Sequence, residues 1–260
     1  SGAGLPLIVH ANSFDAYELA LEGGADILAH GLWTWDGHQG EGDGETLPPA
    51  LENLLDRVVE KDVASMPTLR VLAGDRALFD PHFLEDPALA RVLPPELLAW
   101  YRTEEGQWFG RQLLENLPPE HRTPEAAYEG HTEAMSRAER DTAYLVQRGA
   151  SLLFGSDTPS GPSYGNPPGY NGYLELLTLH RAGLPLDRLL AAATLDNARA
   201  FGLEKTHGTV EPGKIANLLL LKDNPLTSAE AYGTLETVLL HGRPIERASL
   251  AADASRFSPP

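Results

Sequence analysis

Three residues with metal-binding side chains follow short apolar segments that lie far apart in the sequence. His10 follows the apolar segment 5–9, His30 follows the segment 25–29, and Asp157 follows the segment 151–154. Neutral imidazole nitrogen and carboxylate oxygen are the usual zinc ligands where cysteine is absent. The residue types therefore favour a divalent metal site, although the spacing alone also fits hydrogen-bonded structural histidines.

The segments between these residues have the pattern of an alternating α/β fold. Residues 14–22 are helical in pattern, with Ser13 as the N-cap and Gly23 and Gly24 as the stop signal. We predict further helices over residues 48–61, 173–182 and 185–201, and further strands over residues 63–69 and 151–154. Strands that alternate with helices predict a parallel sheet with helices outside it.

Such a sheet would bring several polar residues together. His10, His30, Thr68 and Asp157 each lie where a predicted strand gives way to a loop. Active sites of parallel α/β folds are built at this carboxyl end of the strands. His38 lies in a glycine-rich loop over residues 37–44, where it either touches a substrate or is simply solvated.

The composition excludes several classes of protein. The net charge is −17, which would repel nucleic acid and anionic membrane surfaces. The chain has no cysteine, which excludes disulfides, thiolate metal sites and a cysteine nucleophile. No stretch of about 18 apolar residues is present, so we predict no membrane span. The compartment in which the protein works is left open.

Two regions have a different character. Residues 74–149 have helical periodicity that is interrupted by prolines, and this pattern predicts a helical insertion. Residues 210–221 and 237–245 have strand-like patterns around turn residues, and they follow the alternating part of the chain. The last residues, 251–260, are expected to be frayed.

One enzyme family has similar short sequence motifs at these positions. Val-His10-Ala, Ile-Leu-Ala-His30-Gly, Met-Pro-Thr68-Leu and Phe-Gly-Ser-Asp157-Thr-Pro resemble the second half of an amidohydrolase-superfamily barrel. Residues 191–202 and 208–225 resemble the C-terminal signature of its imidazolonepropionase-like and prolidase-like members. The resemblance covers nearly the whole chain, and residues 74–149 are its least diagnostic part.

The resemblance implies a fold with two parts. We expect an α/β chain that forms the C-terminal half of a (β/α)8 barrel, strands five to eight, with a helical insertion and part of a small β-sandwich. The corresponding domains are a partial barrel over residues 1–205, with its insertion at about 74–149, and the sandwich part over residues 206–260. Strand eight is expected over residues 152–157.

The resemblance also implies the site and its chemistry. His10 and His30 match metal-ligand histidines of strands five and six, and Asp157 matches a strand-eight aspartate that ligates or neighbours the metal. The metal, zinc in our expectation and one or two ions in number, would activate a water and polarise the substrate carbonyl. Asp157 would be the general base. Substrate contacts are expected from His38, Thr68, Tyr164, Asn166 and Tyr170.

The chain departs from the family pattern in one respect. The family's first strand supplies a His-x-His pair, but no two of the nine histidines here are two residues apart. Binuclear members also use a carboxylated lysine or a carboxylate on strand four, and none of Lys61, Lys205, Lys214 and Lys222 fits that position. With a start that is not Met, we expect a C-terminal portion of a protein of roughly 400 residues.

Two histidines and a distant carboxylate rarely hold a catalytic metal, which normally has three protein ligands. We therefore expect the chain to be inactive alone, with unpaired strand edges at residues 5–9 and 151–154. Its partner would be the missing N-terminal half or a second copy of the chain.

The expected function is metal-dependent hydrolysis of C–N bonds in a small amide, cyclic amide or dipeptide. Two alternatives are left open: a non-catalytic relative that serves as a binding or scaffold protein, and a deaminase with the same ligands.

Overall fold

The N-terminal part of the chain forms a parallel sheet of three short strands. The computed structural model describes residues 4–38, 46–161 and 163–252. Strands β1 (Ile8–His10), β2 (Ile27–Ala29) and β3 (Ala64–Met66) pair in this order, in parallel. The register aligns His10 with Ala29, and Ala29 with Met66. The carboxyl ends of the three strands therefore lie at one edge, as predicted.

The predicted strand at residues 151–154 is reduced to one bridge. Leu152 pairs in parallel with Ser65, and Ser65 exchanges backbone hydrogen bonds with Ser151 and Leu153. The ladder ends there because the next residues turn away: the Phe154 N–H donates to Ala192 O instead. The extended strand expected over residues 152–157 is thus too long, although the segment does lie beside β3.

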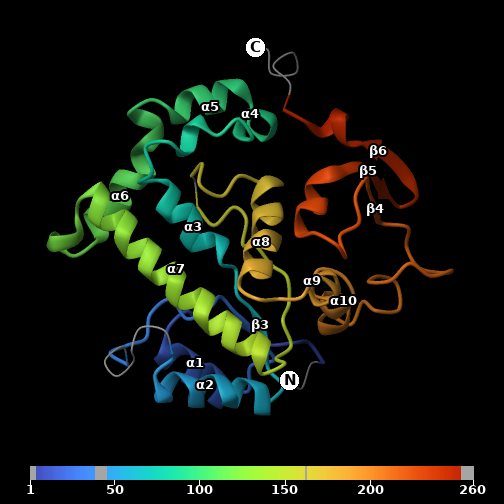
Figure 1. Ribbon diagram of the computed structural model, residues 1–260, viewed down its shortest axis with the longest axis horizontal. Helices are drawn as coiled ribbons and strands as arrows, with labels where there is room; N and C mark the ends of the chain where they lie inside the picture. The colour runs from blue at the N-terminus through green and yellow to red at the C-terminus, as the bar shows by residue number, and fades with distance from the viewer. Residues whose placement is uncertain (1–3, 39–45, 162, 253–260) are drawn as a thin grey trace.

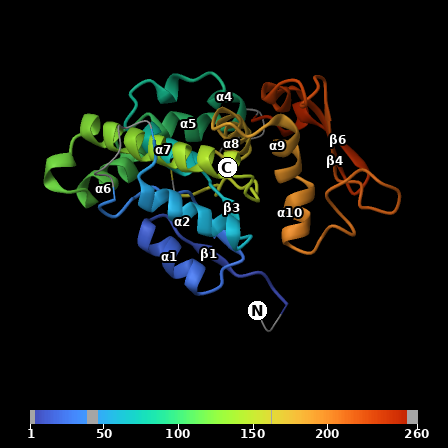
Figure 2. The same cartoon turned by 60° about the horizontal axis from the view of Figure 1, so that its bottom comes forward.

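Helices cover this sheet in layers (Figures 1 and 2). Helix α1 (Phe14–Glu22) has the predicted N-cap, since the Ser13 hydroxyl accepts from the Ala16 N–H. Helix α2 (Pro49–Glu60) packs against α1 and against the long helix α7 (Pro124–Gln147). Buried leucines of α2 contribute to the main core.

The predicted insertion is helical, as its periodicity indicated. It contains α3 (Arg70–Ala77), η1 (Phe83–Glu85), α4 (Leu89–Val92), α5 (Pro95–Tyr101), η2 (Glu105–Gln107), α6 (Trp108–Asn116), η3 (Pro119–His121) and α7. Elements η1, α4 and α5 share a small core with Tyr164 from the loop after Asp157, whereas α7 packs against α2 and α3. The last helix of this region therefore belongs to the outer layer of the main body.

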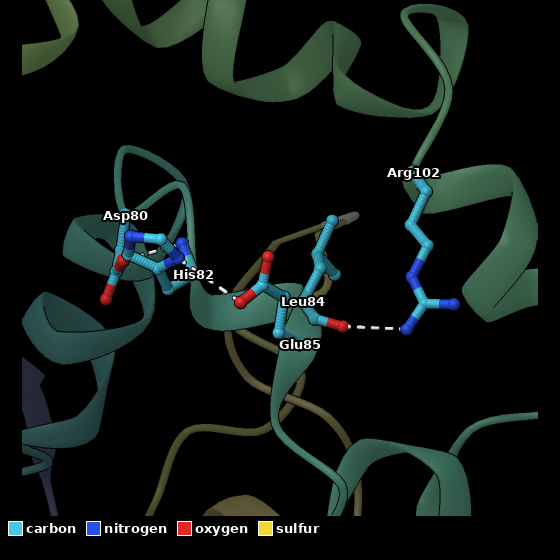
Figure 3. Close-up of polar contacts among 5 residues, drawn as sticks. All are labelled: Asp80, His82, Leu84, Glu85 and Arg102. Atoms are coloured by element: carbon cyan, nitrogen blue, oxygen red, sulfur yellow. Dashed lines mark hydrogen bonds and ion pairs between the residues drawn. The ribbon is translucent and has the colours of Figure 1, made fainter.

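Local polar contacts hold the start of the insertion (Figure 3). The Asp80 carboxylate accepts from the His82 N–H at 2.9 Å, and the Arg102 guanidinium donates to Leu84 O at 2.9 Å. The His82 side chain is mostly exposed and contacts the Glu85 carboxylate at 3.2 Å. This histidine is a surface residue.

Helix α8 (Tyr170–Arg181) begins three residues earlier than predicted. The helix predicted over residues 185–201 is two helices, α9 (Leu186–Ala192) and α10 (Leu195–Ala200). Thr194 separates them with the non-helical dihedrals φ −135° and ψ −87°. Its carbonyl then accepts from the Ala198 N–H, which starts the second helix.

The C-terminal part forms a separate antiparallel sheet, set apart from β1–β3 in both views (Figures 1 and 2). It contains β4 (Leu218–Leu221), β5 (Leu235–Leu240) and β6 (Arg243–Glu246), followed by η5 (Arg247–Leu250); η4 (Ala229–Thr234) precedes β5. Residues 237–245, predicted to be strand-like around turn residues, form a hairpin, because His241 and Gly242 both have positive φ and form its two-residue turn. Only residues 218–221 of the predicted strand 210–221 pair.

Both sheets have exposed apolar residues at an edge. Strand β1 is an edge strand, and Leu5, Leu7 and Ile8 are 70%, 42% and 45% exposed. Strand β4 is also an edge strand, and its Leu219 and Leu220 are exposed. An unpaired apolar strand is a template for pairing with further polypeptide. Residues 39–45 and 253–260, which include most of the predicted glycine-rich segment and of the predicted frayed end, lie outside the described residues.

Among the described residues, no helix is long and apolar enough to cross a membrane.

A buried carboxyl group joins α7 to the loop after β2. Asp141 is buried, and one of its oxygens accepts from the Trp35 indole N–H at 3.2 Å. Burial raises the pKa of Asp141 to about 8, although the Trp35 hydrogen bond and the charges of Arg140 and Arg137 oppose this. The carboxyl group is therefore protonated in the folded chain at neutral pH.

This carboxyl group makes stability depend on pH. The unfolded chain releases the Asp141 proton near pH 4, but the folded chain keeps it until about pH 8. The free energy of unfolding therefore falls as pH rises across this window. Asp141→Asn keeps a neutral side chain of the same shape, so its free energy of unfolding should fall by about 4 kcal/mol less than that of the parent chain between pH 5 and pH 8. Urea denaturation at both pH values measures this, and parallel curves for the two chains would contradict it.

Candidate metal centre

Three of the predicted site residues have an unusual backbone conformation. His30, Thr68 and Asp157 have φ values of 83°, 45° and 46°. Residues other than glycine rarely adopt this left-handed region, at a cost of order 1–3 kcal/mol each, and such strain clusters at functional sites. The three residues follow neighbouring strand segments, so the strain is concentrated at the carboxyl edge of the sheet.

The two predicted ligand histidines are in direct contact. The register aligns His10 with Ala29, so His30 lies one residue beyond it on the next strand. His30 Nε2 is 2.8 Å from His10 Nδ1, and the two rings meet edge to face at 72°. The sheet therefore brings together two nitrogen donors that are separated by 20 residues.

Two further hydrogen bonds fix His30 in place. Its Nδ1 lies 2.6 Å from Thr68 Oγ1, and its backbone carbonyl accepts from the Tyr17 hydroxyl at 2.7 Å. When His30 Nδ1–H donates to Thr68, the Nε2 lone pair is free and faces His10. Thr68, predicted to contact substrate, thus lies behind a histidine and orients it.

Burial and charge act on the His30 imidazole in opposite directions. The ring is only 5% exposed, and burial, together with His10, lowers its pKa. The Asp157 carboxylate is close enough to raise that pKa, but it is the smaller effect. His30 is therefore neutral at pH 7, which is the state that can ligate a metal.

The geometry fits two ligands of a zinc ion. Two nitrogens bound to tetrahedral zinc at 2.0–2.1 Å would lie about 3.3 Å apart, so a separation of 2.8 Å needs only a small adjustment. Asp157 is exposed at the same edge. Nevertheless, the described residues contain no group of three or more His, Cys, Asp or Glu side chains that could hold a metal. A complete coordination shell would need a ligand from elsewhere.

The loop after β2 lies beside this histidine pair. The Trp33 ring is 4.9 Å from the His30 ring, centroid to centroid. His38 is partly buried and its ring packs against Phe14 at 4.0 Å, away from His10 and His30. The structure thus does not join His38 to the histidine pair.

The other predicted substrate residues lie on the loop after Asp157 and on α8. Tyr164 is buried between the rings of Phe83 and Tyr101, and its hydroxyl donates to Leu78 O. Burial raises its pKa to about 12. The polar groups of Tyr164 are therefore used inside the protein.

Asn166 is also buried. In the orientation of the Asn166 amide that satisfies its hydrogen bonds, the nitrogen faces α3 and donates to Arg70 O at 2.7 Å. A Cβ on Gly74 would lie 2.0 Å from the Asn166 side chain, so the absence of a side chain at Gly74 is what allows this approach.

Tyr170 is half-buried, and its hydroxyl donates to the Asp86 carboxylate at 3.3 Å. It lines a cavity of about 970 Å³ between α4, α8 and the β5–β6 hairpin. His10, His30 and Asp157 do not line this cavity. Tyr170 thus lies on a different surface from the histidine pair.

The sequence analysis missed Glu175. Its carboxylate is fully buried on α8 and accepts from the backbone N–H groups of Leu69 and Arg70, at 3.0 and 2.7 Å. Burial raises its pKa to about 7, against those hydrogen bonds and the charge of Arg70. A signal was present, because Asn171, Glu175 and Thr178 form a polar stripe at helical spacing on the buried side of α8.

Comparison with known proteins gives a family match for part of the chain. Residues 131–245 match the amidohydrolase family. Comparison with the sequences of curated proteins gives no match. The sequence similarity therefore lies in the second half of the chain, which includes Asp157, α8 and the antiparallel sheet.

Solved structures show the fold. A Xaa-Pro dipeptidase with methionine in its active site matches with a TM-score of 0.59 and 17% identity, over 94% of this chain and 46% of that one. A prolidase-like protein from Bifidobacterium longum gives 0.58 and 20%, over 94% and 47%. The bottromycin amidohydrolase gives 0.58 and 21%, over 96% and 52%.

The chain spans about half the length of these solved structures. At this identity the likeness concerns the fold. The match of residues 131–245 to the amidohydrolase family, together with this likeness in fold, agrees with the resemblance that the sequence predicted.

Proposed function

We propose that this chain carries half of the active site of a metal-dependent hydrolase of C–N bonds. The observation that carries the proposal is the pair of donors at the carboxyl ends of β1 and β2, His10 Nδ1 and His30 Nε2, 2.8 Å apart. The similar solved structures include a Xaa-Pro dipeptidase and an amidohydrolase by their names. Small amides, cyclic amides and dipeptides are the corresponding substrate class.

We infer that β1, β2, β3 and the segment at Leu152 are strands five to eight of a (β/α)8 barrel, and that the sheet β4–β6 is part of a small β-sandwich. The parallel order β1-β2-β3 followed by the Ser65–Leu152 bridge supports this assignment. The boundary near residue 205 is supported by the end of α10 at Ala200 and the separate antiparallel sheet beyond it.

The proposed roles follow from the contacts. His10 and His30 would hold a divalent metal, zinc by donor chemistry, with Asp157 as a ligand or close neighbour. When bound, the metal would supply an activated water and polarise the substrate carbonyl. Asp157 would accept a proton from the attacking water and return it to the leaving nitrogen as the C–N bond breaks. Thr68 would hold His30 in the tautomer with a free Nε2.

The residues around the histidine pair would contribute to the proposed substrate site in different ways. The polar groups of Tyr164 and Asn166 are occupied by Leu78, Arg70 and Ser160, so these residues would shape the loop after Asp157. Trp33, beside the His30 ring, would form an apolar wall of the site. His38 and Tyr170 would have to turn towards the site to reach a substrate.

We propose that other polypeptide completes the site along the exposed edge of β1. Three observations support this: the apolar residues exposed at the start of that strand and just before it, the two nitrogen donors where a catalytic zinc needs three ligands, and similar structures of about twice the length. The N-terminal half of the same protein, or a second copy of the chain, would supply the remaining ligands. The number of metal ions depends on those ligands.

A non-catalytic binding protein is the second candidate. The observation in its favour is that the described residues lack a group of three metal ligands. A deaminase would use the same ligands on a different substrate. Metal binding separates the first alternative from the hydrolase, and the products separate the second.

The first prediction concerns the ligands. His10→Ala and His30→Ala should each lower the affinity of the chain for Zn²⁺ by at least about 10-fold, because each removes one nitrogen donor. Isothermal titration calorimetry with ZnCl₂ measures this. His82→Ala is the matched control, since His82 lies on the exposed surface of the insertion. Equal affinity in all four chains would contradict the assignment.

The second prediction concerns Thr68. Thr68→Val removes the oxygen that faces His30 Nδ1 and should weaken Zn²⁺ binding by about 10-fold. Thr68→Ser keeps that oxygen and should bind within about 2-fold of the parent chain. If the valine and serine variants bind equally, Thr68 does not orient His30.

The third prediction concerns activity. The purified 260-residue chain with Zn²⁺ should show no turnover of N-acyl amino acids or dipeptides above the buffer rate, because its coordination shell is incomplete. Amine release is followed by a fluorogenic amine reagent. Turnover by the isolated chain that is lost in Asp157→Asn would show that no further polypeptide is needed.

A further inference from the structure

Helix α8 contacts both loops that border the candidate metal centre. One loop follows β3 and contains Thr68, which faces His30. The other follows the Leu152 bridge and contains Asp157. The contacts come from two residues one helical turn apart, Asn171 and Glu175, and both side chains are 0% exposed.

Glu175 is bound to the first loop. Its two carboxylate oxygens accept from the N–H groups of Leu69 and Arg70, the two residues directly after Thr68. These donors belong to the first turn of α3, whose N–H groups have no partner within the helix. The carboxylate therefore fixes the peptide that places Thr68 beneath His30.

Asn171 is bound to the second loop. Its amide nitrogen donates to Ser156 O at 3.1 Å and to Thr158 Oγ1 at 2.6 Å, so it holds the residues on both sides of Asp157. Its amide oxygen accepts from Arg70 Nε at 3.1 Å. Asn171 thus connects the two loops to each other as well as to α8.

We propose that Asn171 and Glu175 are positioning residues that hold the Thr68 and Asp157 loops at a fixed distance from each other. Neither side chain reaches the metal ligands directly: Glu175 acts on His30 through Thr68, and Asn171 acts on Asp157 through its neighbours. This arrangement opposes the relaxation of the left-handed residues Thr68 and Asp157 to ordinary backbone conformations. We call the hydrogen bonds of Asn171 and Glu175 to the two loops the clamp. The functional meaning of the clamp rests on the proposed metal site, but its effect on the two loops can be measured without a metal.

The test compares three variants of the full chain. Glu175→Gln weakens the first contact, and Asn171→Leu removes the second. Leu179→Ala is the matched control, because Leu179 is equally buried on α8 but belongs to the apolar core. Asn171→Asp, which keeps the acceptor for Arg70 and loses the donor to Ser156, serves if Asn171→Leu does not fold.

The first readout is Zn²⁺ affinity by competition with a chromogenic chelator. The Asn171 and Glu175 variants should bind 10- to 100-fold more weakly than the parent chain, and Leu179→Ala should bind within about 2-fold of it despite a lower unfolding midpoint. If Leu179→Ala binds Zn²⁺ as weakly as the Asn171 and Glu175 variants, the affinity follows stability alone, and the positioning role is overturned.

The second readout does not require a metal. In amide hydrogen exchange, Glu175→Gln should lower the protection of the Leu69 and Arg70 amides by at least about 10-fold relative to Leu179→Ala, under conditions where the two have equal global stability. In ¹⁵N imidazole spectra, His30 of Glu175→Gln should lose its single tautomer. If the parent chain binds no Zn²⁺, the proposed function fails, and unchanged protection with an unchanged tautomer would separately overturn the clamp.

Discussion

The approach of two imidazole nitrogens, one from each of two adjacent parallel strands, is the constraint on which the rest of the structure depends. Parallel pairing with His10 opposite Ala29 leaves His30 one residue beyond the ladder, and its left-handed backbone turns the ring towards His10 Nδ1. Two neutral imidazoles gain little from this contact by themselves, because their facing nitrogens share at most one proton. We propose that a cation bound by both nitrogens accounts for this arrangement.

The residues around His10 and His30 restrict the conformation of the two side chains. Burial keeps His30 neutral. The Nδ1 atom of His30 is hydrogen-bonded to Thr68 Oγ1, and the backbone carbonyl of His30 accepts from the Tyr17 hydroxyl. Buried polar groups on α8 form hydrogen bonds to the loops that contain the strained residues at the strand ends. Helix α7 supports the loop after β2 through the hydrogen bond between Trp35 and Asp141. The site is therefore rigid on the side that this chain supplies and exposed on the side of β1. Such an asymmetry is expected of a surface that another polypeptide covers.

The sequence predicted the parts of this arrangement that depend on local pattern. Apolar segments that end in a polar residue identified the carboxyl ends of β1 and β2, and the serine and glycine signals bounded α1. The rule that parallel strands end at one edge predicted that His10 and His30 lie at the same end of the sheet, and the structure adds their direct contact. The family resemblance then assigned the roles that spacing alone left open.

The remaining features depend on contacts between distant residues. Glu175 meets Leu69 across 106 positions, and no local pattern indicates that pair. Thr68 was assigned to the substrate because a strand-end threonine has the same sequence signature in either role. Thr194 divides α9 from α10 within an apolar run that reads as one helix. The strand at Leu152 is short because Phe154 bonds to Ala192 on α9 instead of to β3, a choice that only the packed structure reveals.

The coordination of zinc added to the chain tests the central claim most directly. X-ray absorption at the zinc edge distinguishes imidazole ligands by their outer-shell scattering. We expect two imidazole nitrogens at about 2.0–2.1 Å, reduced to one in His30→Ala, with oxygen ligands completing the shell. A spectrum with oxygen ligands alone, or one that is unchanged in His30→Ala, would contradict the account.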